Sequence, residues 1–167
     1  MKSRLQIGGH PIHAMAVSLP IGLYTAAFIG DLAYLVVRDP FWFKLAFWAI
    51  AIGLVGHLGA ISTGLPDFLA VRAEHLQRPD AWRVATSHLV FGIGLLVVQG
   101  LNAGLRNFGE VPAGGSIAMP VIVNVIAMGV LGVQGWYGGE LVYRHFIGVD
   151  MPQPEESHAG KHKGKRQ

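Results

Sequence analysis

Four long apolar stretches, separated by short polar segments, account for most of the chain. They run over about residues 14–37, 41–65, 84–105 and 117–143. Each exceeds the ~20 residues that a helix needs to cross a hydrocarbon core about 30 Å thick. Each is also apolar around its whole circumference, whereas a helix of a water-soluble protein needs only one apolar stripe. The pattern therefore predicts an all-α protein, an integral membrane bundle of four transmembrane helices in a lipid bilayer.

Composition agrees with this prediction. Hydrophobic residues make up 51% of the chain and charged residues only 14%, whereas soluble domains carry about 25% charged residues. The short loops leave no room for a second domain, so residues 1–150 are expected to form one transmembrane domain. Residues 151–167 are rich in charge, proline and glycine and have no apolar periodicity, which indicates a disordered basic tail.

Lysine and arginine are distributed unevenly between the segments that join the apolar stretches. Ten of the thirteen lie near the two termini or between the second and third stretches, and only Arg38, Lys44 and Arg106 lie on the other side. By the positive-inside rule, both termini are expected to be cytoplasmic. The net charge of +3 thus follows from membrane topology, and no nucleic acid partner is expected.

The chain contains no cysteine, which restricts the cofactors that it can hold. Thiolate metal sites, cysteine-ligated iron–sulfur clusters and covalently attached c-type haem are excluded within this chain. A b-type haem needs only side-chain ligands and stays open. The sequence also lacks phosphate-loop, nucleophile-elbow and zinc-protease motifs, so nothing in it indicates the chemistry of a soluble enzyme.

Histidines and carboxylates near the cytoplasmic ends of the expected helices form the candidate site. The set comprises His10, His13, His88, His145, Asp67 and Glu140. Two imidazoles from different helices can ligate haem iron axially, and imidazoles with carboxylates at one depth suit Zn, Cu or Fe. The alternative is that nothing is bound, because histidine also suits a membrane interface through its polar edges alone.

The leading hypothesis is a haem b held between His13, at the start of the first helix, and His88, about one turn into the third. His10 is three residues before His13 and is an alternative ligand. The groups expected to orient the imidazoles or the haem propionates are Asp67, Glu140 and His145. For a bound metal ion instead of haem, the expected ligands are His10, His13, His88 and Asp67.

Two features suggest that the chain consists of two related helical hairpins. Asp31 and Arg106 each lie eighteen residues beyond a candidate haem ligand, His13 and His88 respectively, and are expected to form a structural ion pair. Glycines also recur every three residues in the second and fourth helices, from Gly53 and from Gly129. Such rows favour close helix packing or a slot for a flat cofactor. If the hairpins are related, His13 and His88 face each other across a pseudo-twofold axis.

His57 lies within the second stretch, about ten residues before Asp67 and so near the expected centre of the bilayer. An ionisable group at that depth is a functional candidate by default. No second histidine is expected at the same depth, and the candidate partners there are Tyr24 and Gln134. A neutral His57 hydrogen-bonded to a neighbouring helix is the alternative.

Several segments together resemble a bacterial family of predicted membrane proteins, domain of unknown function 2231. They are Gly9-His10-Pro11-Ile12-His13, Gly64-Leu65-Pro66-Asp67, His88 and residues 138–143. The resemblance covers about residues 8–148 and implies a four-helix bundle in the bacterial cytoplasmic (inner) membrane. Some members of the family are joined to Rieske-type iron–sulfur domains, which implies electron transfer. Because this chain has no cysteine, its redox partner would be a separate protein.

Other functions stay open beside electron transfer. In one, the chain is a non-catalytic structural subunit of a larger membrane complex or a homo-oligomer, and its glycine faces bind neighbouring helices. In another, it is a small transporter or proton pathway that uses Asp31, His57 and Glu140.

Overall fold

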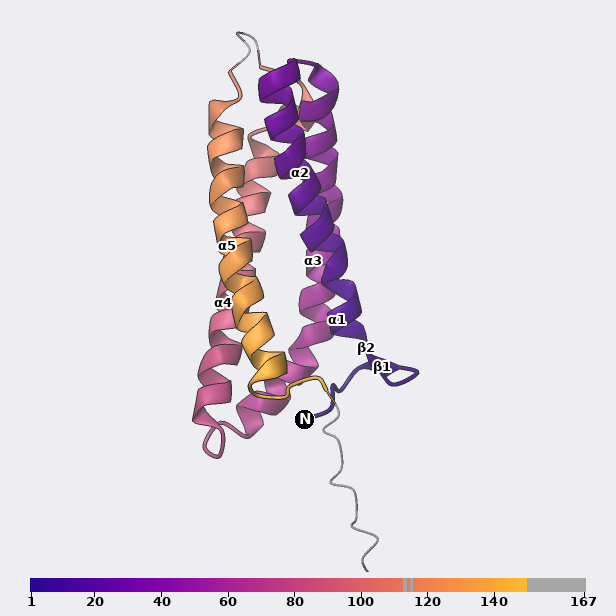
Figure 1. Cartoon of the computed structure of the whole chain (residues 1–167), viewed down its shortest axis with the longest axis vertical. Coiled ribbons are helices and arrows are strands. Elements are labelled where there is room, and N and C mark those ends of the chain that lie inside the picture. The colour runs from indigo at the N-terminus through magenta and orange to yellow at the C-terminus, as the bar shows by residue number, and fades with distance from the viewer. Residues whose placement is uncertain (113, 115, 150–167) are drawn as a thin grey trace, which may run out of the picture.

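The chain folds into an elongated bundle of long helices that lie side by side, as the computed structural model in Figure 1 shows. The structure describes residues 1–112, 114 and 116–149. The α-helices are α1 (Ile12–Ala16), α2 (Ser18–Val37), α3 (Pro40–Ala73), α4 (Pro79–Gly104) and α5 (Ala118–Tyr143). Four helical segments are long and apolar enough to cross a membrane, since α1 and α2 together form one of them. The predicted all-α membrane bundle is confirmed. The predicted tail lies outside the described residues.

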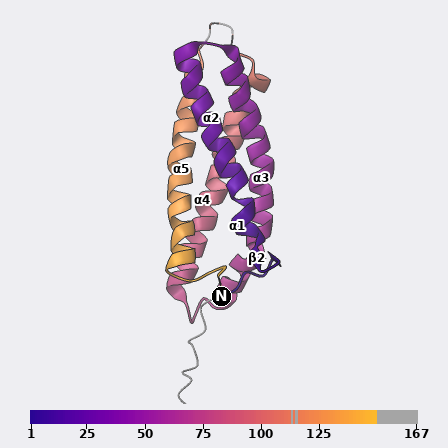
Figure 2. The ribbon, with the colours of Figure 1, turned by 45° about the vertical axis from the view of Figure 1, so that its right-hand side comes forward.

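Short elements occur only at the ends of the bundle in the described part of the chain. Strands β1 (Gln6–Ile7) and β2 (His10–Pro11) pair as an antiparallel hairpin that projects sideways beside α1 (Figure 1). A 3-10 helix, η1 (Asn107–Gly109), follows α4. Figure 2 shows both ends of the described chain at one end of the bundle, here named the terminal end. The α2–α3 turn lies at the opposite end, here named the distal end.

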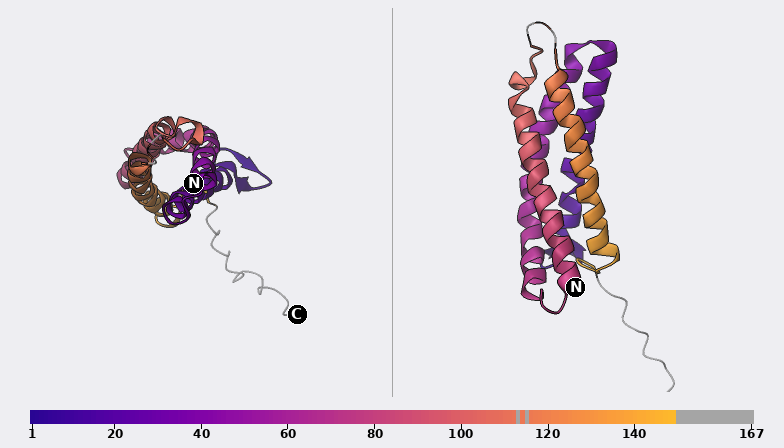
Figure 3. Two further views of the ribbon diagram at one scale, coloured as in Figure 1. Left: turned by 90° about the horizontal axis from the view of Figure 1, so that it is seen from above. Right: turned by 90° about the vertical axis from the view of Figure 1, so that its left-hand side faces the viewer.

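Neighbouring helices enclose the interior as a ring, seen from above in Figure 3. Helix α2 packs mainly against α3, and α4 mainly against α5, so the bundle consists of two helical hairpins, α1–α3 and α4–α5. The two hairpins contact each other where α3 packs against α4 and where α2 packs against α5. Helices α1 and α2 therefore lie diagonally opposite α4. Side chains from these diagonal helices that point inward meet in the middle of the bundle, where four-helix proteins build their cofactor sites.

Helix α3 does not end near residue 65 with the second apolar stretch, but continues through Pro66 to Ala73. Proline removes one backbone hydrogen bond and strains the preceding turn, a local cost of about 3 kcal/mol. Residues after Pro66 offset this cost, because Val71 packs in a buried cluster with Ala81 and Ala85 of α4. The loop between α3 and α4 is correspondingly shorter than the sequence predicts.

Helix α4 begins at Pro79 rather than near residue 84. Proline suits the first helical turn because its missing N–H has no partner there in any case. His88 therefore lies nine residues into α4, about 13 Å from its start, and not one turn in. The first membrane-spanning segment is broken at Val17, which separates α1 from α2. Pro20 cannot donate to the carbonyl four residues before it, which accounts for the break.

Five fully buried polar side chains form a closed ring of hydrogen bonds in the distal half of the bundle. They are Asp31, Gln99, Asn102, Arg106 and Asn124. Arg106 donates to both carboxylate oxygens of Asp31, at 2.8 and 2.6 Å, and through Nε to Asn102 at 3.1 Å. Asn102 donates to Gln99 at 3.1 Å, and Gln99 donates to Asn124 at 3.3 Å. Asn124 closes the ring by donating to Asp31 at 2.6 Å.

This polar ring joins α2, α5 and the end of α4, and the Arg106 guanidinium also lies over the ring of Phe43 from α3, 5.0 Å from its centre. The ion pair predicted between Asp31 and Arg106 is thereby confirmed. In a bilayer, polar groups of this kind must find their partners inside the bundle. The ring thus fixes how the two helical hairpins meet.

Candidate functional site

His13 and His88 meet inside the bundle. Their ring centres are 6.4 Å apart and their ring planes are nearly perpendicular, at 89°. His13 comes from α1 and His88 from α4, so the contact joins the two hairpins along the diagonal of the ring of helices. Both side chains are half-buried. The prediction that the two histidines face each other is confirmed.

Each imidazole is held by a backbone carbonyl of the partner helix in its own hairpin. The Nδ1 atom of His13 lies 2.8 Å from the carbonyl oxygen of Ala60 in α3, and that of His88 lies 3.1 Å from the carbonyl oxygen of Gln134 in α5. A carbonyl oxygen only accepts, so Nδ1 is the protonated nitrogen in both neutral rings. The Nε2 lone pair of each ring therefore stays available to a ligand, which is the arrangement of a metal-binding histidine.

A glycine lies one turn after each of these carbonyls and makes room for the imidazole. A Cβ atom at Gly64 would lie 2.8 Å from two atoms of the His13 ring, and one at Gly138 would lie 3.2 Å from the His88 ring. The carbonyls concerned belong to Ala60 and Gln134, four residues earlier in each case. A side chain at Gly64 would therefore clash with the His13 ring, and one at Gly138 would crowd the His88 ring.

The two halves of the site are equivalent in sequence as well as in space. His88 follows His13 by 75 residues, and Gly138 follows Gly64 by 74. Asp31 and Arg106, which pair in the polar ring, are also 75 residues apart. The same contacts therefore occur once in each hairpin, which is the geometry expected of two related hairpins.

The remaining predicted ligands are engaged elsewhere. Asp67 accepts a hydrogen bond from the backbone N–H of Arg4 at 2.5 Å and so anchors the N-terminal segment to α3. His10 is exposed in the β-hairpin, where its Nδ1 lies 3.0 Å from the carbonyl oxygen of Gly8. In the described part of the chain, no group of three or more His, Asp or Glu side chains could hold a metal ion. The structure does not gather the predicted set of three histidines and Asp67.

Glu140 and His145 lie near the terminal end of α5 and also have other partners. Glu140 accepts from Arg144 at 3.2 Å, one turn further along the chain. The backbone carbonyl of His145 accepts from Arg78 at 2.6 Å, which ties the end of the described chain to the start of α4. Neither contact is made to an imidazole of the central pair.

His57 is closer to this pair than its position in the sequence suggests. It lies on α3 only three residues before Ala60, whose carbonyl holds His13. Its Nδ1 atom is 3.3 Å from the hydroxyl oxygen of Tyr24 in α2, and both side chains are buried. The predicted alternative of a hydrogen bond to a neighbouring helix is confirmed, with Tyr24 as the partner.

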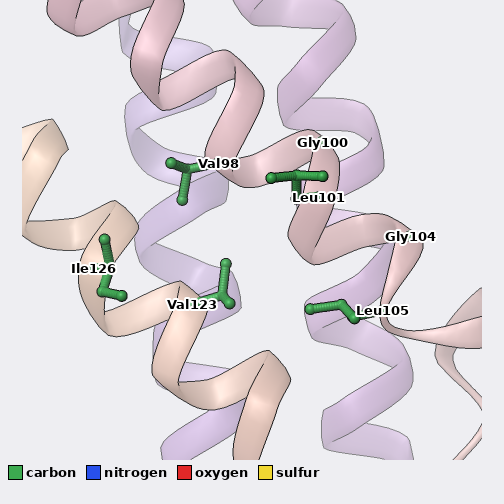
Figure 4. Close-up of a pocket in the computed structure, with 7 residues that line it drawn as sticks. All are labelled: Val98, Gly100, Leu101, Gly104, Leu105, Val123 and Ile126. Carbon is green, nitrogen blue, oxygen red and sulfur yellow. The ribbon is translucent and has the colours of Figure 1, made fainter.

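The outer surface of the bundle has apolar hollows, and two of them, formed by described residues, include neither His13 nor His88. One, shown in Figure 4, has a volume of about 560 Å³ between α4 and α5. It is lined by Val98, Gly100, Leu101, Gly104, Leu105, Val123 and Ile126. The other has a volume of about 520 Å³ between α2 and α3. Lipid acyl chains are the natural neighbours of such surfaces in a bilayer.

A family model described as "Predicted membrane protein (DUF2231)" matches residues 9–151, nearly all of the chain. The chain belongs to this family. No curated protein and no solved structure matches it. The family match covers all four membrane-spanning segments and both histidines of the central pair, and its description gives no activity. A chemical role therefore has to be argued from the site itself.

Proposed function

We propose that this DUF2231 protein binds haem b between His13 and His88 and takes part in electron transfer in the membrane. The observation that carries the proposal is the contact of two imidazoles across the bundle, at 6.4 Å between ring centres. Both rings are oriented by carbonyl acceptors, so both present Nε2 as the free donor atom. Bound haem supplies one-electron exchange at its iron.

The spacing of the two rings fits one metal atom between them. Imidazole nitrogen binds a metal at about 2 Å, and two rings held in this way have centres roughly 6 Å apart. The perpendicular ring planes are compatible with such an arrangement, because a metal that binds one nitrogen of each ring sets no required angle between the two ring planes. The ring spacing alone is equally compatible with the iron of a haem and with a single metal ion.

The number of donors favours haem over a metal ion held by protein alone. A closed zinc site takes four protein ligands, whereas haem iron takes only two, because the macrocycle supplies the other four nitrogens. The described residues gather two imidazoles and no third His, Asp or Glu that completes a metal site. A Zn, Cu or Fe ion with exogenous ligands is the second choice for the same pair.

The residues around the pair would prepare it for this role. The carbonyls of Ala60 and Gln134 accept from Nδ1, which fixes the orientation of each ring and makes Nε2 a stronger donor. Gly64 and Gly138 allow that approach. The positive-inside pattern supports a position of the pair nearer the cytoplasmic face of a bacterial inner membrane, with both termini cytoplasmic. A separate redox protein would exchange electrons there.

Absorption spectra of the detergent-purified protein test the proposal. We expect that protein produced with added haem has a Soret band that sharpens on dithionite reduction, with split α and β bands of low-spin haem. Metal analysis of the same sample distinguishes haem iron from bound Zn or Cu. A colourless sample after haem reconstitution contradicts the haem assignment, and a colourless, metal-free sample contradicts the site as a whole.

A structural subunit is the second candidate, favoured by one observation on α5. An added Cβ at Gly129, Gly132 or Gly135 meets no atom of the described residues within 4 Å, so no described helix packs against this face of α5. Small residues on an open helix face suit close approach of a helix from another chain. Co-purification of colourless protein with one stable membrane partner supports this function, and a pigmented protein without a partner contradicts it.

A further inference from the structure

The N-terminal β-hairpin lies outside the ring of helices. Strands β1 and β2 are joined by Gly8 and Gly9, both with positive φ, as tight two-residue hairpin turns require. Figure 3 shows the hairpin projecting sideways from the ring, and residues 4–10 are all exposed. A two-stranded hairpin on its own is marginally stable in water, so a surface outside the bundle that covers it would stabilise it.

Helix α3 gives the depth of the hairpin in the membrane. Residues 45–66, between Lys44 and Asp67, include no Asp, Glu, Lys or Arg. The helix rises about 35 Å between Lys44 and Asp67, which is close to the ~30 Å thickness of a hydrocarbon core. Lys44 is exposed and pairs with Glu110 at the distal end. Asp67 therefore marks the boundary of the hydrocarbon core nearer the terminal end.

Two contacts hold the hairpin at this boundary. Before the hairpin, the backbone N–H of Arg4 donates to the Asp67 carboxylate at 2.5 Å. After it, the His13 ring bonds to the carbonyl of Ala60, which lies about 10 Å deeper along α3 than Asp67. Helix α3 itself continues past Asp67 to Ala73, about 9 Å further toward water. A hairpin that projects sideways at this level lies along the membrane surface.

The hairpin carries the side chains that suit such a surface. Leu5 and Ile7 alternate with Gln6 and so share one face, and they are 37% and 68% exposed. The side chain of Arg4, at the base of the hairpin, is exposed as well. The outer edges of a two-stranded hairpin need water or headgroups as hydrogen-bond partners, which the hydrocarbon core does not supply. An apolar face, a cation and polar edges together match the headgroup region of a bilayer.

We propose that the β1–β2 hairpin is an interfacial lipid anchor. Leu5 and Ile7 enter the edge of the hydrocarbon, and the Arg4 guanidinium binds the phosphate of an anionic phospholipid. Because β2 leads directly into α1, the anchor also fixes the depth at which the first membrane-spanning segment begins. This role requires no bound haem or metal.

Nitroxide spin labels measure the depth of the hairpin, since a chain without cysteine takes a single label at any chosen position. Labelled Ile7→Cys and Gln6→Cys are placed in vesicles of phosphatidylethanolamine and phosphatidylglycerol. Collision of each label with O₂, which concentrates in hydrocarbon, is compared with its collision with a water-soluble nickel chelate. Val55→Cys, 70% exposed near the middle of the uncharged run of α3, is the reference for hydrocarbon. Gln77→Cys, exposed in the loop between α3 and α4, is the reference for water.

We expect the Ile7 label to collide more with O₂ than with the nickel chelate, and the Gln6 label to show the reverse. An Ile7 label that is as accessible to the nickel chelate as the Gln77 label overturns the proposal. An Ile7 label that is shielded from both reagents also overturns it, because the hairpin then lies against protein, either a second copy of this chain or another chain.

Arg4→Gln tests the contact with the lipid phosphate, since it removes the cation and keeps the backbone N–H that Asp67 accepts. We expect it to raise the nickel accessibility of the Ile7 label by up to about fivefold, the effect of losing one cation near an anionic surface. Replacing phosphatidylglycerol by phosphatidylcholine should raise it in the wild type too. Arg72→Gln, at an exposed position near the end of α3, is the matched control and should leave it unchanged. Equal accessibility in Arg4→Gln and Arg72→Gln overturns the assignment of Arg4 to a lipid phosphate.

Discussion

The carboxylate of Asp31 and the guanidinium of Arg106 form a bidentate ion pair, and neither side chain is exposed to solvent. Arg106 Nη1 lies 2.8 Å from Asp31 Oδ1, and Nη2 lies 2.6 Å from Oδ2. They come from different helical hairpins and occupy equivalent positions in them, 75 residues apart. Neither charge has water to replace a lost partner, because each lies inside a membrane-spanning bundle. The pair therefore holds the hairpins together at the distal end, while the imidazole pair joins them nearer the terminal end.

Replacing Arg106 by leucine should destabilise the bundle by about 3–5 kcal/mol, since it leaves a buried carboxylate without its cation. The free energy of unfolding in mixed micelles, from a denaturing-detergent titration, measures the effect. Lys44→Leu is the control, because its ion pair with Glu110 is exposed and such pairs contribute at most about 1 kcal/mol. Equal stabilities of Arg106→Leu and Lys44→Leu would show that the buried pair does not hold the hairpins together.

Alanine at Gly64 or Gly138 should weaken haem binding about 10- to 100-fold, the usual effect of losing a group that orients a metal ligand. The added Cβ would lie 2.8 Å from the His13 ring, which has to shift off its carbonyl, or 3.2 Å from the His88 ring, which it would crowd, so the larger effect is expected at Gly64. A haem titration followed at the Soret band gives the affinity. Gly59→Ala and Gly132→Ala are matched controls on α3 and α5, since neither meets an atom within 4 Å. If all four variants bind haem equally well, the glycines do not position the rings.

Asp67→Ala should loosen the N-terminal segment and leave the haem affinity unchanged. The carboxylate accepts the backbone N–H of Arg4 and is not directed at the imidazole pair. Hydrogen–deuterium exchange of residues 4–12 should become faster, while exchange in α4 stays the same. Asp80→Ala, at an exposed position in the first turn of α4, is the control. If Asp67→Ala loses haem while hydrogen–deuterium exchange of residues 4–12 is unchanged, Asp67 belongs to the cofactor site and does not anchor the N-terminal segment.

The membrane-spanning architecture could be predicted from the sequence because a bilayer restricts which residues a crossing segment can contain. A segment that crosses the hydrocarbon core must be long, apolar and helical, so its pattern alone identifies it. His13 and His88 could be paired for a similar reason, since the sequence predicts both near helix starts at the same end of the bundle, although His88 lies about 13 Å into α4. Asp31 and Arg106 lie at equal distances along the chain from His13 and His88, and this match between the hairpins also indicated that the two histidines are equivalent.

Helix boundaries and interior contacts could not be predicted in the same way. The continuation of α3 beyond Pro66 depends on packing between Val71 and α4, which no local pattern records. Because the sequence predicts an earlier end for α3, it also predicts a larger difference in depth between His57 and His13 than the structure has. The hydrogen bonds from the imidazoles to the carbonyls of Ala60 and Gln134 depend on which helices are neighbours. The only signal in the sequence was the glycine that follows each carbonyl by four residues.

The most direct measurement is the reduced-minus-oxidised absorption spectrum of His13→Ala and of His88→Ala, each reconstituted with haem beside the wild type. Both variants are expected to lose the low-spin α and β bands, because each would remove one of the two imidazole nitrogens that the proposal assigns to the haem iron. His75→Ala is the control, since its ring lies at the loop between α3 and α4 and bonds to the carbonyl of Arg72; it should keep the full spectrum. A full low-spin spectrum in both His13→Ala and His88→Ala would contradict haem ligation by this pair.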